Sequence, residues 1–97
     1  MKRFTVYPDL HNLEILKQYK DSIELLVDLE GFSRIGLFKK NDLLLLSEFS
    51  LVLEWDLLHS EDEIEKKYKE YQEIAHFFSS IRILDQGLLL LIKDQWQ

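Results

Sequence analysis

Apolar and polar positions alternate with a period of two in the middle of the chain. Between residues 23 and 30 every odd position is aliphatic, and three of the four even positions are acidic. This alternation is typical of a half-buried β-strand. The same period runs through residues 43–57, where it places Trp55 at a buried, odd position. Because that stretch is long for one strand, a bend or turn is expected near Ser47 and Glu48.

Two other stretches repeat apolar residues every three or four positions and are predicted to be helices. The first covers residues 9–20, with Asp9 as its capping residue after Pro8. The second covers residues 61–80 and begins with Ser60 and Glu63 in the S-x-x-E spacing of a capping box. Three acids follow Ser60 directly, where the helix dipole favours negative charge.

Four shorter apolar or β-branched runs are bounded by Pro8, Gly31 or Gly87 and are predicted to be strands. They are residues 3–7, 33–38, 81–84 and 88–92. The second run is interpreted as an antiparallel return of the strand before Gly31, and Gly87 as part of a turn between the last two. The predicted fold is one α+β domain over residues 1–97, with a mostly antiparallel sheet of about five to seven strands and two helices packed on one face.

The charge of the chain is negative and unevenly distributed. The chain is 46% hydrophobic and 12% aromatic, too apolar for intrinsic disorder, and its net charge is −6. Residues 42–65 contain eight acids and no Lys or Arg. Nucleic-acid binders need clustered basic residues to neutralise phosphates, so direct nucleic-acid binding is not expected. An acidic balance of this kind serves either solubility or recognition of a basic partner.

Cysteine usage and apolar runs indicate a cytoplasmic protein. The chain contains no cysteine, so it needs no oxidising compartment. The apolar stretch after the basic start ends at Pro8, which is too short for a signal peptide. The longest apolar runs, residues 43–46 and 88–92, are far shorter than a membrane span, so no membrane partner is expected.

No catalytic residue, metal site or cofactor is predicted. The three glycines form neither of the known phosphate-binding loops. Glu73 and His76 have the i, i+3 spacing of a di-iron helix, but the chain has one such motif and one long helix where that site needs several. Asp56 and His59 are three residues apart, yet no nucleophile accompanies them. We therefore expect the chain not to be an enzyme.

The even positions of the predicted strands form the candidate partner-binding face. If the odd positions face the helices, the opposite face combines a few aliphatic residues with an acidic rim. The candidate partner-binding residues are Glu24, Leu26, Asp28, Glu30, Glu48, Val52, Glu54 and Asp56. A solvated sheet face with stray aliphatic residues is the alternative interpretation, since antiparallel sheets commonly have one.

The expected function is that of a small acidic binding protein. It would dock on and inhibit a basic partner, such as a nuclease toxin or another nucleic-acid-processing protein, as immunity proteins and charge-mimic inhibitors do. Its acids would stand in for phosphates, while Leu26 and Val52 would supply the desolvated centre. The alternative is a homo-oligomeric structural or regulatory domain without catalysis, a homodimer for example.

Overall fold

The computed structural model describes residues 3–84 and 86–95, and within them it contains four β-strands and four α-helices. The strands are β1 (Phe4–Val6), β2 (Ile23–Asp28), β3 (Ser50–Trp55) and β4 (Ser80–Ile83). The helices are α1 (Leu13–Lys17), α2 (Leu43–Leu46), α3 (Glu61–Ile74) and α4 (Gln86–Gln95). Short 3-10 helices precede α1 and α2 and follow α3; they are Leu10–Asn12, Lys40–Asp42 and Ala75–Phe77.

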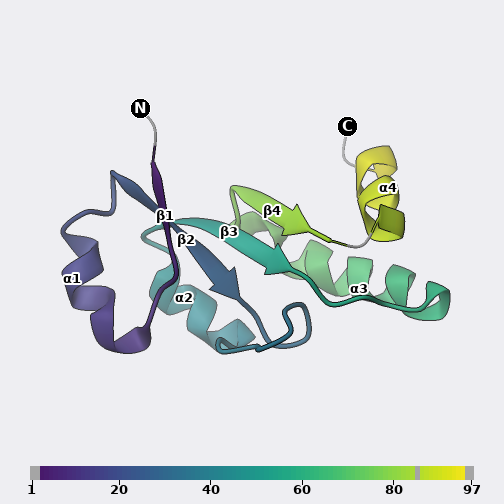
Figure 1. The fold of residues 1–97 in the computed structure, drawn as a ribbon, viewed down its shortest axis with the longest axis horizontal. Helices are drawn as coiled ribbons and strands as arrows, with labels where there is room; N and C mark the ends of the chain where they lie inside the picture. The colour runs from purple at the N-terminus through teal and green to yellow at the C-terminus, as the bar shows by residue number, and fades with distance from the viewer. Residues whose placement is uncertain (1–2, 85, 96–97) are drawn as a thin grey trace.

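All four strands are parallel and lie in the order β1-β2-β3-β4 (Figure 1). Leu25 lies opposite Leu51, and Leu53 lies opposite Ile81. The prediction of an antiparallel sheet of five to seven strands with two helices is therefore wrong. Alternation along a strand is the same in both kinds of sheet and does not report direction. The helical segments between successive strands were the signal for parallel crossovers, because such crossovers usually contain a helix.

Three segments predicted as strands have other structures. Residues 33–38 belong to a loop, and only an isolated parallel bridge joins Leu29 to Phe38. Residues 43–46 form α2, in which Leu43 and Leu46 are buried, as expected for one face of a helix. Residues 88–92 lie inside α4, and so does Gly87, which was expected in a turn.

Other predicted elements are confirmed. The strand expected over residues 23–30 is β2, and the helix expected over residues 61–80 is α3 with the 3-10 turn after it. The capping box is present: the backbone N–H of Ser60 donates to Glu63 Oε1 at 3.3 Å, and the Ser60 hydroxyl donates to the same oxygen at 2.8 Å. The Asp9 carboxylate accepts from the backbone N–H of His11 at 3.0 Å and caps the first 3-10 helix.

Helices α2 and α3 lie behind the sheet in the view of Figure 1, while α1 and α4 stand to its left and right. The hydrophobic core fills the space between the sheet and the helices. The odd positions of β2 and β3 face this core, and Trp55 is 0% exposed. The Trp55 ring meets Phe32 edge-on, with 4.7 Å between centroids, and lies 5.3 Å from Tyr71 of α3. Residues of α2, α3 and α4 complete the core; they are Leu43, Leu46, Tyr71, Ile74, Leu88 and Ile92. None of the helices within the described residues is both long and apolar enough to cross a membrane.

Candidate functional site

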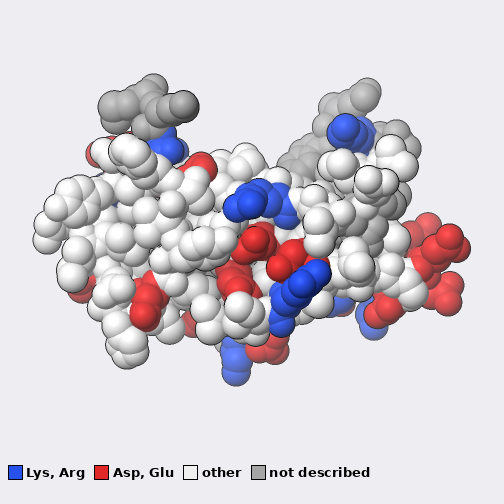
Figure 2. All heavy atoms as spheres, in the orientation of Figure 1, with Lys and Arg blue, Asp and Glu red and all other residues white. Residues whose placement is uncertain are grey.

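The face of the sheet opposite the core, which we name the open face, contains the even strand positions. These positions are Thr5, Glu24, Leu26, Asp28, Ser50, Val52, Glu54, Ser80 and Arg82. Figure 2 shows carboxylates gathered near the middle of this side of the molecule, with basic side chains on two sides of them. Leu26 and Val52 do not belong to the core cluster between sheet and helices.

Asp28, at the end of β2, holds the loop that follows it. Its side chain is 8% exposed, and its Oδ1 accepts from the backbone N–H of Gly36 at 2.6 Å. Gly36 has φ +66°, and a Cβ there would lie 3.0 Å from the Cα of Glu30. Both observations require glycine at this position. The Asp28 carboxylate therefore has a structural role, whatever else it binds.

Two further side chains fasten the same loop to β3. The Ser33 hydroxyl accepts from the backbone N–H of Leu29 at 2.9 Å and donates to the carbonyl of Glu54. Asp56 Oδ1 accepts from the backbone N–H of Arg34 at 2.7 Å. The loop is therefore tied to the carboxyl ends of both central strands, with Arg34 at the end of β3.

The loop is also anchored on the core side. Phe32 is 1% exposed and packs against Trp55. The ammonium of Lys67 on α3 lies 5.2 Å from the centroid of the Phe32 ring, within the range of a cation–π contact. Lys67 also pairs with Glu70 at 3.0 Å, and this hydrogen bond lowers the pKa of the Glu70 carboxyl. Contacts on both sides of the sheet thus determine where Arg34 lies.

A pocket of about 300 Å³ lies beside this loop, at the carboxyl ends of β3 and β4. Its lining residues are Arg34, Glu54, Asp56, Arg82, Ile83 and Leu84. Glu54 and Arg82 are directly opposite each other in the register of β3 and β4. Parallel strands in sequential order with helices on one side also form (β/α)8 barrels, whose binding sites lie at the carboxyl ends of the strands. The pocket occupies the corresponding position.

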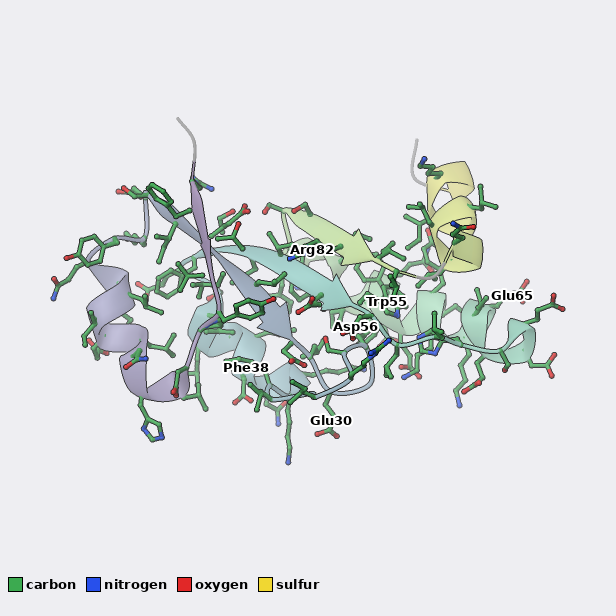
Figure 3. The ribbon with its side chains drawn as sticks, in the orientation of Figure 1. Glu30, Phe38, Trp55, Asp56, Glu65 and Arg82 are labelled. Atoms are coloured by element: carbon green, nitrogen blue, oxygen red, sulfur yellow. The ribbon has the colours of Figure 1, made fainter. Side chains whose placement is uncertain are left out.

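Sequence reasoning missed both arginines of this pocket. The signal for Arg82 was available, because it stands between Ile81 and Ile83 and so takes the even, outward position of its strand. No signal was available for Arg34, because the bonds of a loop decide where it lies. Figure 3 shows Arg82 and Asp56 approaching the same region of the open face from β4 and from the end of β3.

The structure brings together only part of the predicted partner-binding set. Glu24 lies on the open face, and its Oε1 accepts from the Thr5 hydroxyl at 2.9 Å. Leu26 and Val52 also lie there, but they are 0% and 4% exposed. Asp28, Glu54 and Asp56 are placed at the carboxyl ends of their strands as described above.

Glu30 and Glu48 are separate from this group. Glu30 is exposed in the loop after β2. Glu48 follows α2, and its carboxylate lies 3.6 Å from the ammonium of Lys17 on α1. The prediction counts Glu48 among the even positions of the period-two pattern in residues 43–57, but residues 43–46 form a helix and β3 begins only at Ser50.

Two residue pairs have the spacing of a metal site or an acid–base pair, namely Glu73 with His76 and Asp56 with His59. Glu73 and His76 are both exposed, and within residues 3–84 and 86–95 no group of three or more His, Cys, Asp or Glu residues could hold a metal ion. His59 Nε2 accepts from the indole N–H of Trp55 at 2.9 Å, which assigns His59 a part in holding the core tryptophan.

No protein-family model matches the chain, and no curated protein or solved structure matches it either.

Proposed function

We propose that the open face of the sheet docks a basic protein partner and that the chain is a small, cytoplasmic, acidic inhibitor of the immunity or charge-mimic type. A nuclease toxin or another nucleic-acid-processing protein is the class of partner that such a surface fits. The observation that carries the proposal is the position of three half-buried carboxylates, those of Glu24, Glu54 and Asp56, on the side of the sheet opposite the core. Asp28 lies on the same side, but it is only 8% exposed and holds the loop after β2.

The partner would meet carboxylates and not an apolar centre. Leu26 and Val52 are almost completely buried in this structure, so neither side chain offers apolar area to a partner. Glu24 and Glu54 are half-buried, and their main-chain positions on adjacent strands are fixed by the sheet. Charged groups held in this way steer a partner of opposite charge and act mainly on the association rate.

A basic partner fits this face better than a second copy of the chain. Two open faces placed together would confront the carboxylates of Glu24, Glu54 and Asp56 with three more, and the pocket described above offers Arg34 and Arg82 of each copy to offset them. Burying charges without full pairing costs several kcal/mol. A partner with clustered Lys or Arg would pair with the carboxylates instead.

The test compares two double variants with the same change of net charge. Glu24→Lys with Glu54→Lys reverses two charges on the open face, and Glu65→Lys with Glu73→Lys reverses two on exposed positions of α3. The partner is first identified by affinity capture from the native host and mass spectrometry. Association rates are then measured at low and high salt, where we expect the open-face variant to associate at least about tenfold more slowly at low salt.

Both variants should keep the fold, because none of the four side chains is buried. Far-UV circular dichroism and urea unfolding serve as the check. If the open-face variant associates as fast as the native chain at low salt, the carboxylates serve only solubility and the docking proposal is wrong.

A homo-oligomer is the second candidate, and one observation favours it. β1 and β4 are the two edges of the sheet, and Phe4 on β1 is 75% exposed. Unpaired edge strands can pair with another chain. Sedimentation equilibrium at micromolar concentration decides the matter: a dimer that persists at high salt supports edge pairing, and a monomer at both salt concentrations rejects it.

A further inference from the structure

The pocket at the carboxyl ends of β3 and β4 contains charges of both signs. Two guanidinium groups, of Arg34 and Arg82, and two carboxylates, of Glu54 and Asp56, line it. Its volume of about 300 Å³ is at the lower end of the range for small-molecule sites. Arginine stays protonated at every physiological pH. The four side chains combine two formal positive charges with two formal negative charges.

The two arginines are available to a ligand. Both are exposed, and among the residues that the structure describes neither guanidinium makes an ion pair or a side-chain hydrogen bond. Arg34 uses its backbone N–H, not its side chain, to bond Asp56 Oδ1. The other oxygen of that carboxylate is not part of this bond, so Asp56 can accept from a ligand as well.

The main chain around the pocket is held in place before any ligand binds. Arg82 and Glu54 stand on paired strands, opposite each other in register. The bonds of Ser33 and Asp56 fasten the loop of Arg34 to β3. A site held in this way loses less conformational freedom on binding than a mobile one.

We propose that this pocket binds a small zwitterion, namely a free amino acid or a short peptide. The guanidinium groups of Arg34 and Arg82 supply the donors for its carboxylate, because arginine pairs with carboxylates through charge-assisted hydrogen bonds. Glu54 and Asp56 hold its ammonium. Ile83 and Leu84 supply an apolar wall, which favours an aliphatic side chain on the ligand. A simple anion would face the two carboxylates, and a simple cation would face the two arginines.

This inference does not rest on the docking proposal. The pocket shares Glu54 and Asp56 with the proposed docking surface, but it is the two arginines that specify a zwitterion. The test uses the chain alone, without any protein partner, so its result and the result of the partner test are independent.

The test titrates the ¹⁵N-labelled chain with L-leucine and records amide chemical shifts. The Arg34 amide is the main reporter, because it donates to Asp56 Oδ1. Two matched compounds each lack one charge of leucine: 4-methylpentanoate has no ammonium, and 3-methylbutylamine has no carboxylate. We expect a saturable shift with leucine and at least about tenfold weaker binding of either matched compound, because each loses one set of charged hydrogen bonds.

Variants assign the binding to the pocket. Arg34→Gln and Arg82→Gln should each weaken leucine binding by at least about tenfold. Arg34→Gln keeps the backbone N–H that holds the loop. Lys69→Gln removes the same charge from an exposed position of α3 and should leave the affinity unchanged.

Three outcomes would overturn the proposal. Equal affinity for 4-methylpentanoate and leucine would make the pocket an anion site. Equal loss of affinity in all three variants would place the binding elsewhere. The absence of any saturable shift would mean that the pocket does not bind an aliphatic amino acid.

Discussion

Leu25 and Leu26 are neighbours on β2, both 0% exposed, and they lie on opposite faces of the sheet. Leu25 belongs to the core cluster that the helices cover, whereas Leu26 lies outside it, beside Val52 and between Glu24 and Asp28 on the open face. Equal burial therefore has two causes. On one face the aliphatic and aromatic side chains of the core exclude water, and on the other the surrounding strand positions are largely polar or charged.

The two faces of the sheet therefore have different roles, because the core face determines stability and the open face is the proposed recognition surface. The core face contains most of the buried apolar side chains, which supply most of the free energy of folding. The open face contains charged groups whose positions depend on that folded core. Substitutions on the first face should change stability strongly, and substitutions on the second should change binding at smaller cost to folding.

The largest expected effect contrasts these two leucines directly. Leu25→Ala should lower the free energy of unfolding by about 2–5 kcal/mol, because it leaves a cavity among packed side chains. Leu26→Ala should cost about 2 kcal/mol, near the lower end of that range, because Leu26 lies outside the core cluster and we expect its surroundings to close more of the space. Urea unfolding of both variants measures the difference. Equal losses would mean that the open face is packed as rigidly as the core.

The second expected effect tests how completely water is excluded from the core face. Burial, with a smaller contribution from Tyr68, raises the pKa of Tyr71 to about 12. The neutral phenol is thus favoured in the folded chain, and an unfolded tyrosine has a pKa near 10. The contribution of the neutral Tyr71 phenol to the free energy of unfolding is complete below pH 10. It is lost as the pH rises toward 12, and the loss amounts to roughly 2 to 3 kcal/mol.

Tyr71→Phe isolates this contribution from other groups that titrate at high pH. Urea unfolding at pH 9 and pH 11 should show a smaller loss of stability in Tyr71→Phe than in the native chain. Tyr19→Phe is the control, because Tyr19 is 56% exposed and its variant should behave as the native chain does. An unchanged pH dependence in Tyr71→Phe would contradict a raised pKa for Tyr71.

A third, smaller effect distinguishes two carboxylates of the open face. Asp28→Ala leaves the Gly36 N–H without its acceptor and should cost about 1–3 kcal/mol. Asp28→Asn keeps an acceptor oxygen and should recover most of that loss. Glu24→Ala removes only an exposed bond to Thr5 and should stay within about 0.5 kcal/mol. If Asp28→Ala costs no more than Glu24→Ala in urea unfolding, the loop does not depend on this carboxylate.

The smallest expected effect concerns the helix that covers much of the core. Ser60→Ala removes part of the capping box of α3 and should cost about 0.5 to 2 kcal/mol in urea unfolding. The hydrogen bond from Ser60 lowers the pKa of Glu63. This bond therefore adds stability above the unfolded pKa of Glu63, and the contribution disappears as the pH falls through the lower folded value.

Ser60→Ala should consequently lose less stability than the native chain when the pH is lowered from 6 to 3. Ser47→Ala, in the turn after α2, is the control and should stay within about 0.5 kcal/mol at both pH values. A loss below about 0.2 kcal/mol for Ser60→Ala at neutral pH would show that the capping box does not stabilise α3.

Part of the candidate site could be predicted from the sequence. Alternation through β2 and β3 correctly placed Glu24 and Glu54 on the face opposite the core, because side-chain direction along a strand is a local property. The pocket could not be predicted in the same way. It needs β4 beside β3, which sets Arg82 opposite Glu54, and it needs the loop bonds that bring Arg34 to the end of β3.

The sequence by itself determined the elements whose signals are local. The capping box of α3, the alternation of β2 and the cap at Asp9 each depend on residues within a few positions of one another. Tertiary structure decided the direction of the strands. It also decided whether the two leucine-rich runs, residues 43–46 and 88–92, form strands or helices. Residues 43–46 are apolar at every position and fit a helix as well as a strand, so the pattern alone cannot choose between them. The packing of Leu43 and Leu46 against the core makes that choice, because only a helix turns both toward the same layer.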